Sequence, residues 1–340
     1  MQRHKIISIL ISGLAVLLLS TAALSQYHKV NLDSNQVGGA RHIDPLQVNG
    51  WGLAYGPGGP IWVSDEGSGW STIYDGQGNK KSLEVLIPSA GAGTGSPTGI
   101  VFNGSTDDFQ VQNWKAIFLF ATLDGTISGW APQSNPNAAI IAVNNSASGN
   151  VYTALAITNK LSGNVLYAAD LAHGRVEMYD ASFNLVKTFT DSDVPDGFVP
   201  FGLQDINGVL YVSFAPSSGA PGGVVDIFRE DGTFVRHLAQ GPPLNQPWGF
   251  AMAPANFGKL SNTLLVSNNT NAGVINGFNP MTGKFVGAVR DANGKDILID
   301  QLWGIEFGGG TANDGRTNQL FFTAGPHRNL TGTFGVISLP

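Results

Sequence analysis

Two polar residues stand at positions where a repeated pattern of this sequence otherwise has small apolar residues. Six short segments begin with an aromatic residue or threonine, followed by glycine or alanine and then an apolar residue. Three residues after the start, two of these segments have Gln204 and Glu306, whereas the others have Ala54, Val101, Ala156 and Ala251. A carboxylate in an apolar register is desolvated, which raises its pKa unless it is paired. We therefore predict Glu306 as a catalytic acid or base and Gln204 as a ligand-binding residue. The alternative for Glu306 is pairing with a backbone amide or an arginine.

Oxygen-bearing side chains recur where a second set of β-prone segments ends. Carboxylate and amide oxygens are the ligands that a hard cation such as calcium prefers. The predicted metal ligands are Asp65, Glu66, Asp124, Asp170 and Asn268. His173 lies in one of the same loops and is predicted to bind a ligand. The alternative is that these residues cap turns by accepting hydrogen bonds from backbone amides, a structural role that would also repeat.

Four large aromatic residues open equivalent segments. They are Trp51, Phe201, Trp248 and Trp303, and a glycine follows each of them. If the segments surround an axis, these side chains ring one end of it, and an aromatic-lined pocket suits a sugar or a flat organic ligand. The alternative is that the aromatic rings pack between neighbouring repeats, beside the small glycines.

The repeats that carry these residues predict a β-propeller. The opening pattern occurs six times, roughly every 50 residues, and each copy continues with further short apolar segments bounded by glycine, proline or asparagine. Four such segments make an antiparallel sheet that cannot bury both of its faces alone. Six copies therefore predict an all-β fold, a six-bladed β-propeller of four-stranded antiparallel blades.

The two ends of the chain are expected to close the ring together. The last repeat has three strand-like segments and then stops, whereas residues 27–32 form a spare β-prone segment before the first complete repeat. We predict that this N-terminal strand completes the last blade, because pairing there removes an open sheet edge. Residues 26–340 are accordingly expected to form one propeller domain.

The N-terminus carries the features of an export signal. Basic residues at positions 3–5 precede an apolar stretch over residues 6–19, and small residues precede a cleavage site after Ser25. We predict a signal peptide over residues 1–25 and a secreted or periplasmic protein. The alternative is an uncleaved anchor, although the apolar stretch is shorter than the roughly 20 residues of a spanning helix.

The composition of the sequence argues against several classes of partner and site. The formal net charge is −6 and no basic run occurs, which argues against nucleic acid and, after signal cleavage, against a membrane surface. Cysteine is absent, which excludes thiolate nucleophiles and cysteine-ligated zinc or iron–sulfur sites. A chain of this length can bury a large core without disulfides. We expect it to act as a monomer.

Several segments resemble known propellers. Residues 166–176 resemble an NHL-type repeat. The sequence as a whole is similar to a family of secreted bacterial proteins known only as conserved hypothetical proteins, on the basis of segments 49–54, 246–249, 302–304 and 322–326. The resemblance implies a six-bladed propeller with NHL-like repeats. It implies no particular activity.

Two function classes follow from the residues. No Gly-x-Ser-x-Gly elbow, phosphate-binding loop or His-Glu-x-x-His motif is present. Because no catalytic set can be assembled, the sequence favours an exported propeller that binds a protein, glycan or small-molecule ligand at one face of the ring. The alternative is a calcium-dependent hydrolase or lyase with its site in the central channel.

Overall fold

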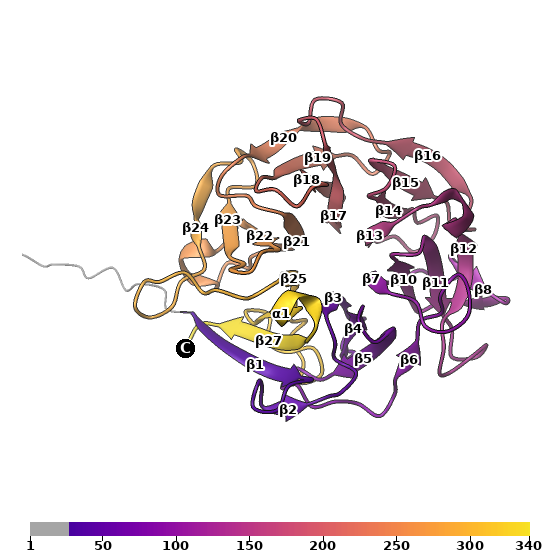
Figure 1. The fold of residues 1–340 in the computed structure, drawn as a ribbon, viewed down its shortest axis with the longest axis horizontal. Helices are drawn as coiled ribbons and strands as arrows, with labels where there is room; N and C mark the ends of the chain where they lie inside the picture. Colours follow the sequence, from indigo (N-terminus) through magenta and orange to yellow (C-terminus); the bar gives the residue numbers. More distant parts are fainter. Residues whose placement is uncertain (1–26) are drawn as a thin grey trace, which may run out of the picture.

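The computed structural model describes residues 27–340, and these residues form six small antiparallel sheets around a central axis (Figure 1). The predicted six-bladed β-propeller is therefore confirmed. The predicted signal peptide, residues 1–25, lies outside the described residues.

Each blade has an inner strand next to the axis and three further strands toward the rim. The inner strands of blades 1 to 6 are β3 (Gly50–Ala54), β7 (Pro97–Phe102), β13 (Tyr152–Ile157), β17 (Phe198–Ile206), β21 (Pro247–Met252) and β25 (Leu302–Phe307). The second strands are β4 (Ile61–Asp65), β10 (Phe118–Thr122), β14 (Leu166–Asp170), β18 (Val209–Pro216), β22 (Leu264–Asn268) and β26 (Leu320–Ala324). The third strands are β5 (Trp70–Tyr74), β11 (Thr126–Trp130), β15 (Arg175–Tyr179), β19 (Val224–Phe228), β23 (Ile275–Phe278) and β27 (Thr333–Ser338).

The outer strands complete the blades and close the ring. They are β6 (Val85–Leu86), β12 (Ile140–Asn144), β16 (Leu185–Phe189), β20 (Phe234–Gln240), β24 (Phe285–Ala288) and, in blade 6, β1 (His28–Ser34). The N-terminal strand β1 pairs antiparallel with β27, as predicted, so that the first and last strands of the described residues lie in one sheet (Figure 1).

A few short elements lie outside this pattern. They are β2 (His42–Ile43), which extends the last sheet, the hairpin of β8 (Gln110–Val111) and β9 (Trp114–Lys115), two 3-10 turns (Ser146–Ser148 and Gly258–Leu260) and the single turn α1 (Pro326–Asn329). None of the helices within residues 27–340 is long and apolar enough to cross a membrane.

The glycine in the sequence pattern that begins each inner strand lets neighbouring inner strands approach each other closely. A Cβ added at Gly202 would overlap the carbonyl oxygen of Trp248, and one at Gly249 would lie 2.8 Å from the carbonyl oxygen of Trp303. A hydroxyl on the second strand makes a hydrogen bond across the same boundary. Ser267 donates to the carbonyl oxygen of Trp303 at 2.6 Å. The repeated opening is thus the means by which each blade is tied to the next.

The hydrophobic core is divided among the blade boundaries. The described residues form six buried clusters, and five of them take their members from two neighbouring blades. The sixth cluster joins blades 3 and 4 and also includes tryptophans of blades 1, 5 and 6. Along an inner strand, successive side chains point to opposite faces of the sheet. The residue after the glycine, such as Leu53, therefore packs toward the preceding blade, and the next residue, such as Ala54, packs toward the following blade.

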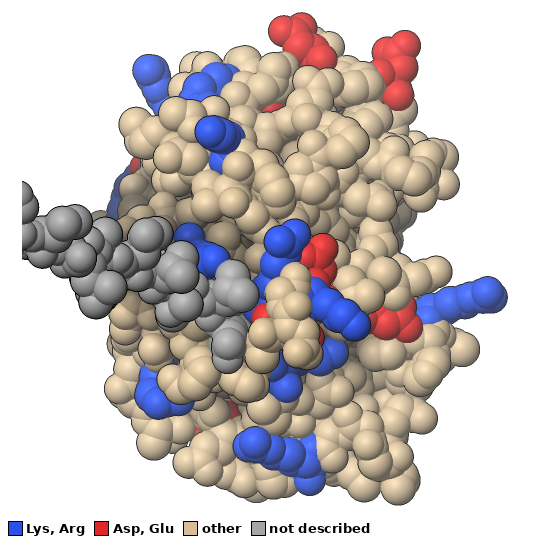
Figure 2. Space-filling model, turned by 90° about the vertical axis from the view of Figure 1, so that its left-hand side faces the viewer, with Lys and Arg blue, Asp and Glu red and all other residues tan. Residues whose placement is uncertain are grey.

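The surface carries few charged side chains. Only 12% of all residues are Asp, Glu, Lys or Arg. Figure 2 shows one side of the molecule, on which Lys and Arg side chains and a few Asp and Glu side chains are scattered among uncharged residues. This distribution agrees with the absence of a basic run in the sequence.

Candidate functional site

The two ends of the axis differ in chemistry. We call the end where the inner strands begin the aromatic end, and the end where they finish the pocket end. The predicted aromatic residues lie at the first, and Glu306 and Gln204 lie at the second, near the ends of β25 and β17.

The aromatic end is filled by the four predicted aromatic side chains. Trp51 stacks on Trp303 with ring centroids 3.6 Å apart, and Trp248 packs edge-on against both rings. Phe201 contacts Trp303 with centroids 5.8 Å apart. All four side chains are at most 9% exposed. The rings pack on one another instead of lining an open pocket, so the packing alternative describes their arrangement, and their predicted role in ligand binding stays untested.

Hydrogen bonds hold two of these indoles in place. Trp248 Nε1 donates to the carbonyl oxygen of Thr153 at 3.1 Å, and Trp303 Nε1 donates to Asn49 Oδ1 at 3.0 Å. Asn49 in turn donates to Glu66 Oε2 at 2.7 Å. Asn49, Gln246 and Gln301 each stand two residues before a tryptophan and have a positive φ of about 50°. The same backbone turn therefore precedes each of the three tryptophans and places its indole ring at the axis.

The pocket end opens into a cavity of about 640 Å³. It is lined by residues from the ends of the inner strands of blades 1, 4, 5 and 6 and from loops of blades 3 and 4, including Tyr55, Lys160, Asp205, Glu230, Met252 and Phe307. Gln204 and Glu306 line this cavity and also two smaller hollows that continue toward the axis and toward blades 1 to 3. The two residues singled out by their register thus meet in one place.

The pairing of the inner strands explains this meeting. Glu306 pairs with Phe321 of the second strand, Gln204 with Tyr211, and Ala251 with Leu265, at the same place in each blade. The predicted equivalence of these positions is confirmed. In blades 4 and 6, polar side chains therefore occupy a position that faces the next blade and is alanine or valine in the other blades.

Glu306 has an unusual environment. Its side chain is partly exposed to the cavity, and none of the described residues donates a hydrogen bond to it or forms an ion pair with it. Burial raises the pKa of Glu306 from 4.5 to about 8, so that its carboxyl group is mostly protonated at neutral pH. Pairing with a backbone amide or an arginine, the alternative that the sequence left open, is not found within residues 27–340.

Other polar groups of the cavity were missed by sequence reasoning. Burial raises the pKa of Asp205, and Glu230 adds to this effect, while the backbone N–H of Gly208 opposes it. Asp205 Oδ2 is buried and has no hydrogen-bond partner, whereas Glu230 forms an ion pair with Lys160 at 2.6 Å. The one signal for Asp205 was its place directly after Gln204. Lys160 and Glu230 come from loops that the repeat pattern does not define.

The predicted metal ligands do not assemble into one site. Asp65 Oδ2 accepts hydrogen bonds from the backbone N–H of Thr72 at 3.1 Å and from the hydroxyl of the same residue at 2.6 Å, in blade 1. Asp124 Oδ2 accepts one from the backbone N–H of Ala90 at 2.6 Å, and Asn268 Oδ1 accepts one from Asn245 at 2.8 Å. Within residues 27–340 no three of the predicted acidic ligands come together as a group that could hold a metal. The capping alternative describes these contacts, and calcium binding stays a prediction.

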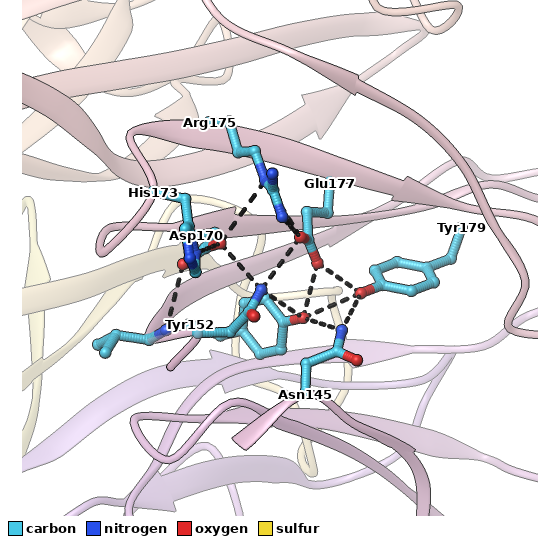
Figure 3. Close-up of polar contacts among 9 residues, drawn as sticks. Asn145, Tyr152, Asp170, His173, Arg175, Glu177 and Tyr179 are labelled. Carbon is cyan, nitrogen blue, oxygen red and sulfur yellow. Dashed lines mark hydrogen bonds and ion pairs between the residues drawn. The ribbon is translucent and has the colours of Figure 1, made fainter. Parts of the chain in front are cut away.

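Asp170 and His173 belong to a polar network inside blade 3 (Figure 3). His173 Nδ1 lies 2.6 Å from Asp170 Oδ2, and Asn150 donates to the same oxygen at 2.8 Å. Asn150 also donates to Glu177 at 3.0 Å. Burial alone would raise the pKa of Glu177, but its hydrogen-bonded neighbours outweigh burial and lower it; they are Tyr152, Tyr179 and Arg175. Because each carboxylate in this network has hydrogen-bond donors, we interpret the network as a structural support of blade 3.

The six sheets around one axis define a β-propeller of the six-bladed class. The chain belongs to the same family as uncharacterized protein R648 of Acanthamoeba polyphaga mimivirus, with 30% identity over 329 residues, 91% of this chain and 80% of R648. It is also 31% identical over 298 residues to uncharacterized protein L690 of the same virus, covering 82% of this chain and 78% of L690.

These relatives correct part of the sequence-based resemblance. They are viral proteins and not bacterial ones, and no family model matches this chain, NHL models included. The NHL-like character of the repeats is therefore not shown. The part of the resemblance that is confirmed is the six-bladed propeller.

Solved structures with the same fold include enzymes. A gluconolactonase from Xanthomonas campestris aligns with a TM-score of 0.54 at 14% identity, covering 86% of each chain. A streptogramin B lyase aligns with a TM-score of 0.53 at 14% identity, covering 92% of this chain and 97% of the lyase. At such low identity the likeness concerns the fold alone.

Proposed function

We propose that this protein binds a neutral, polyhydroxylated small ligand, such as a terminal sugar of a glycan, in the cavity at the pocket end. One observation carries the proposal. Glu306, a carboxyl group with no hydrogen-bond donor among the described residues, lines a cavity of about 640 Å³, a volume within the usual range of ligand pockets.

The polar groups of the cavity suit hydroxyl groups. Protonated Glu306 offers an O–H donor and a carbonyl acceptor, and Gln204 offers an amide donor and acceptor. Asp205 lines the same cavity, and a carboxyl group adds further hydrogen-bond acceptors for hydroxyl groups. Tyr55 and Phe307 supply aromatic surface beside these groups.

The charges of the cavity argue against an anionic ligand. Asp205 and Glu230 face the cavity, and the Lys160 ammonium group that also faces it is already paired with Glu230. A carboxylate or phosphate would approach these acidic groups without a free cation to receive it. A neutral ligand meets no such repulsion.

Export is part of the proposal. The predicted signal peptide would bring the cavity to the periplasm or the outside of the cell, where glycans are available. The mass of the protein recovered from the periplasm or the medium tests this step, with cleavage after Ser25 as the expected result. A full-length chain in the cytoplasm would contradict it.

The test of binding is a calorimetric titration with neutral, anionic and cationic saccharides. We expect binding of neutral sugars, and a loss of more than about tenfold in affinity in Glu306→Leu and Gln204→Ala, since each removes hydrogen-bonding groups. Gln240→Ala is the matched control for Gln204→Ala, because Gln240 is exposed on the outer strand of blade 4. Binding of anions only, or equal binding by Glu306→Leu, would contradict the proposal.

A second candidate is a hydrolase or lyase that acts in the same cavity. The observation that favours it is the pKa of Glu306 near 8, because a general acid works best when its pKa lies near the working pH. Turnover of a bound sugar or lactone by the wild type, abolished in Glu306→Gln, would establish this candidate. Binding of a sugar or lactone without turnover would support the binding function instead of the enzymatic one.

A further inference from the structure

A cluster of three possible metal ligands lies near the rim, away from the cavity. Asp226 of β19 and His237 of β20 pair across neighbouring strands of blade 4. Asp191 comes from the loop between β16 and β17, which joins blade 3 to blade 4. One carboxylate oxygen of each aspartate and a ring nitrogen of His237 lie within 4.8 Å of one another. Side chains from one loop and two strands thus lie close together in this cluster.

The distances within this cluster suit a shared ion. His237 Nδ1 lies 2.7 Å from Asp226 Oδ1 and 3.4 Å from Asp191 Oδ2. Ligands that bind zinc at about 2.0–2.1 Å in a tetrahedron are separated by about 3.3 Å. An ion between these three groups therefore requires only small movements of their side chains.

The two carboxylates carry oxygens that nothing in the described chain satisfies. The side chain of Asp226 is 0% exposed and that of Asp191 is 4% exposed. Asp226 Oδ2 and Asp191 Oδ2 are buried without a hydrogen-bond partner, whereas Asp191 Oδ1 accepts from the backbone N–H of Asp193. Each carboxylate thus keeps one buried oxygen without a donor, which is costly, and a cation between the two carboxylates removes that cost.

The charges of the cluster also favour a bound cation. The two buried carboxylates carry two formal negative charges, and the one cationic group beside them within the described chain, His237, supplies at most one positive charge. A divalent ion would supply the missing positive charge and hold both in their ionised form.

We propose that Asp191, Asp226 and His237 form a binding site for a divalent metal ion of the zinc class. An imidazole nitrogen with two carboxylates is a ligand set that zinc accepts, whereas calcium takes six to eight oxygen ligands. His237 is 35% exposed, so solvent reaches one side of the cluster. The site would tie the loop after blade 3 to the outer strands of blade 4.

The test is zinc binding to protein stripped with a chelator and dialysed. Elemental analysis and a competition titration with Zn²⁺ are expected to give one ion per chain. His237→Ala and Asp226→Asn are expected to lower the affinity by more than about tenfold. His173→Ala is the matched control, because His173 is equally exposed and also contacts a buried aspartate, Asp170, but lies outside the cluster. It is expected to bind as the wild type does.

A second measurement covers variants that fold poorly. Zn²⁺ is expected to raise the melting temperature of the wild type and of His173→Ala, but not that of Asp191→Asn, since binding to the folded state stabilises it. The proposal is overturned if the wild type binds no stoichiometric zinc, if His237→Ala and Asp226→Asn bind as tightly as the wild type, or if calcium binds one to one and zinc does not.

Discussion

The indole rings of Trp51 and Trp303 stack with their centroids 3.6 Å apart, across the boundary between blade 1 and blade 6. The ring closes within blade 6, where β1 pairs with β27, and the stack joins this blade to blade 1 at the aromatic end of the axis. Together with Trp248 and Phe201, the two rings fill that end. A small ligand therefore has access to the axis from the pocket end, where Glu306 and Gln204 lie.

Removing one ring of the stack is expected to destabilise the fold. Trp303 is 2% exposed, so Trp303→Ala should cost about 3–5 kcal/mol of unfolding free energy. Trp114→Ala is the control, because Trp114 is 50% exposed, and it should cost well under about 1 kcal/mol. Urea unfolding of the three proteins measures this. Similar losses in both variants would mean that the aromatic end does not hold the ring together.

A methyl group at the blade boundary should also be costly. A Cβ at Gly202 overlaps the carbonyl oxygen of Trp248, so Gly202→Ala forces two inner strands apart and should cost about 1–3 kcal/mol or more. At Gly91 an added Cβ meets nothing within 4 Å. Gly91→Ala should leave the melting temperature unchanged. Equal melting temperatures for both variants would contradict the account of the repeated glycine.

Glu306 should make stability depend on pH. Its folded pKa, about 8, exceeds its ordinary value of 4.5, so the folded chain holds this proton more tightly than the unfolded chain between those pH values. The contribution of Glu306 is therefore fully present below about pH 4.5 and is lost as the pH rises to 8.

Glu306→Gln isolates this effect, because glutamine mimics the protonated acid and does not ionise. Relative to the wild type, the variant should gain on the order of 2 kcal/mol between pH 5 and pH 9. Urea unfolding of both proteins at several pH values measures the difference. A difference that stays constant over this range would show that Glu306 ionises normally.

The closing strand should be essential for stability. Leu32 of β1 is 1% exposed within the cluster between blades 6 and 1, so Leu32→Ala should cost about 2–5 kcal/mol. Deletion of residues 27–32 should lower the melting temperature further, because it exposes the edge of β27. Val37→Ala serves as the control, since Val37 is 91% exposed. An unchanged melting temperature after the deletion would show that the ring does not depend on this strand.

The sequence predicted features that depend on local pattern. The opening around Gly202, Gly249 and Gly304 repeats because every blade boundary needs the same close approach, and this repetition predicted both the fold and the register of Glu306. The spare segment at residues 27–32 predicted the closure for the same reason. A pattern of residues that recurs in every blade can be recognised in the sequence without knowing how the blades pack together.

Features that join different repeats could not be predicted in this way. Lys160 and Glu230 reach the cavity from loops of blades 3 and 4, and loop paths follow no repeat. Asp191, Asp226 and His237 meet only after a loop of one blade packs on the strands of the next. The aromatic residues were found at the correct end, but how tightly they pack on one another depends on their rotamers.

The most direct test of the central claim is to locate bound ligand by NMR of the ¹³C-labelled methionine methyl groups. The described chain has Met178, Met252 and Met281, of which Met252 lines the cavity and Met281 is 79% exposed elsewhere. On titration with a neutral saccharide that binds, the Met252 signal should shift in the wild type and should not shift in Glu306→Leu. The Met281 signal should stay in place in both. Saturable binding that leaves the Met252 signal unmoved would contradict the claim that this cavity is the binding site.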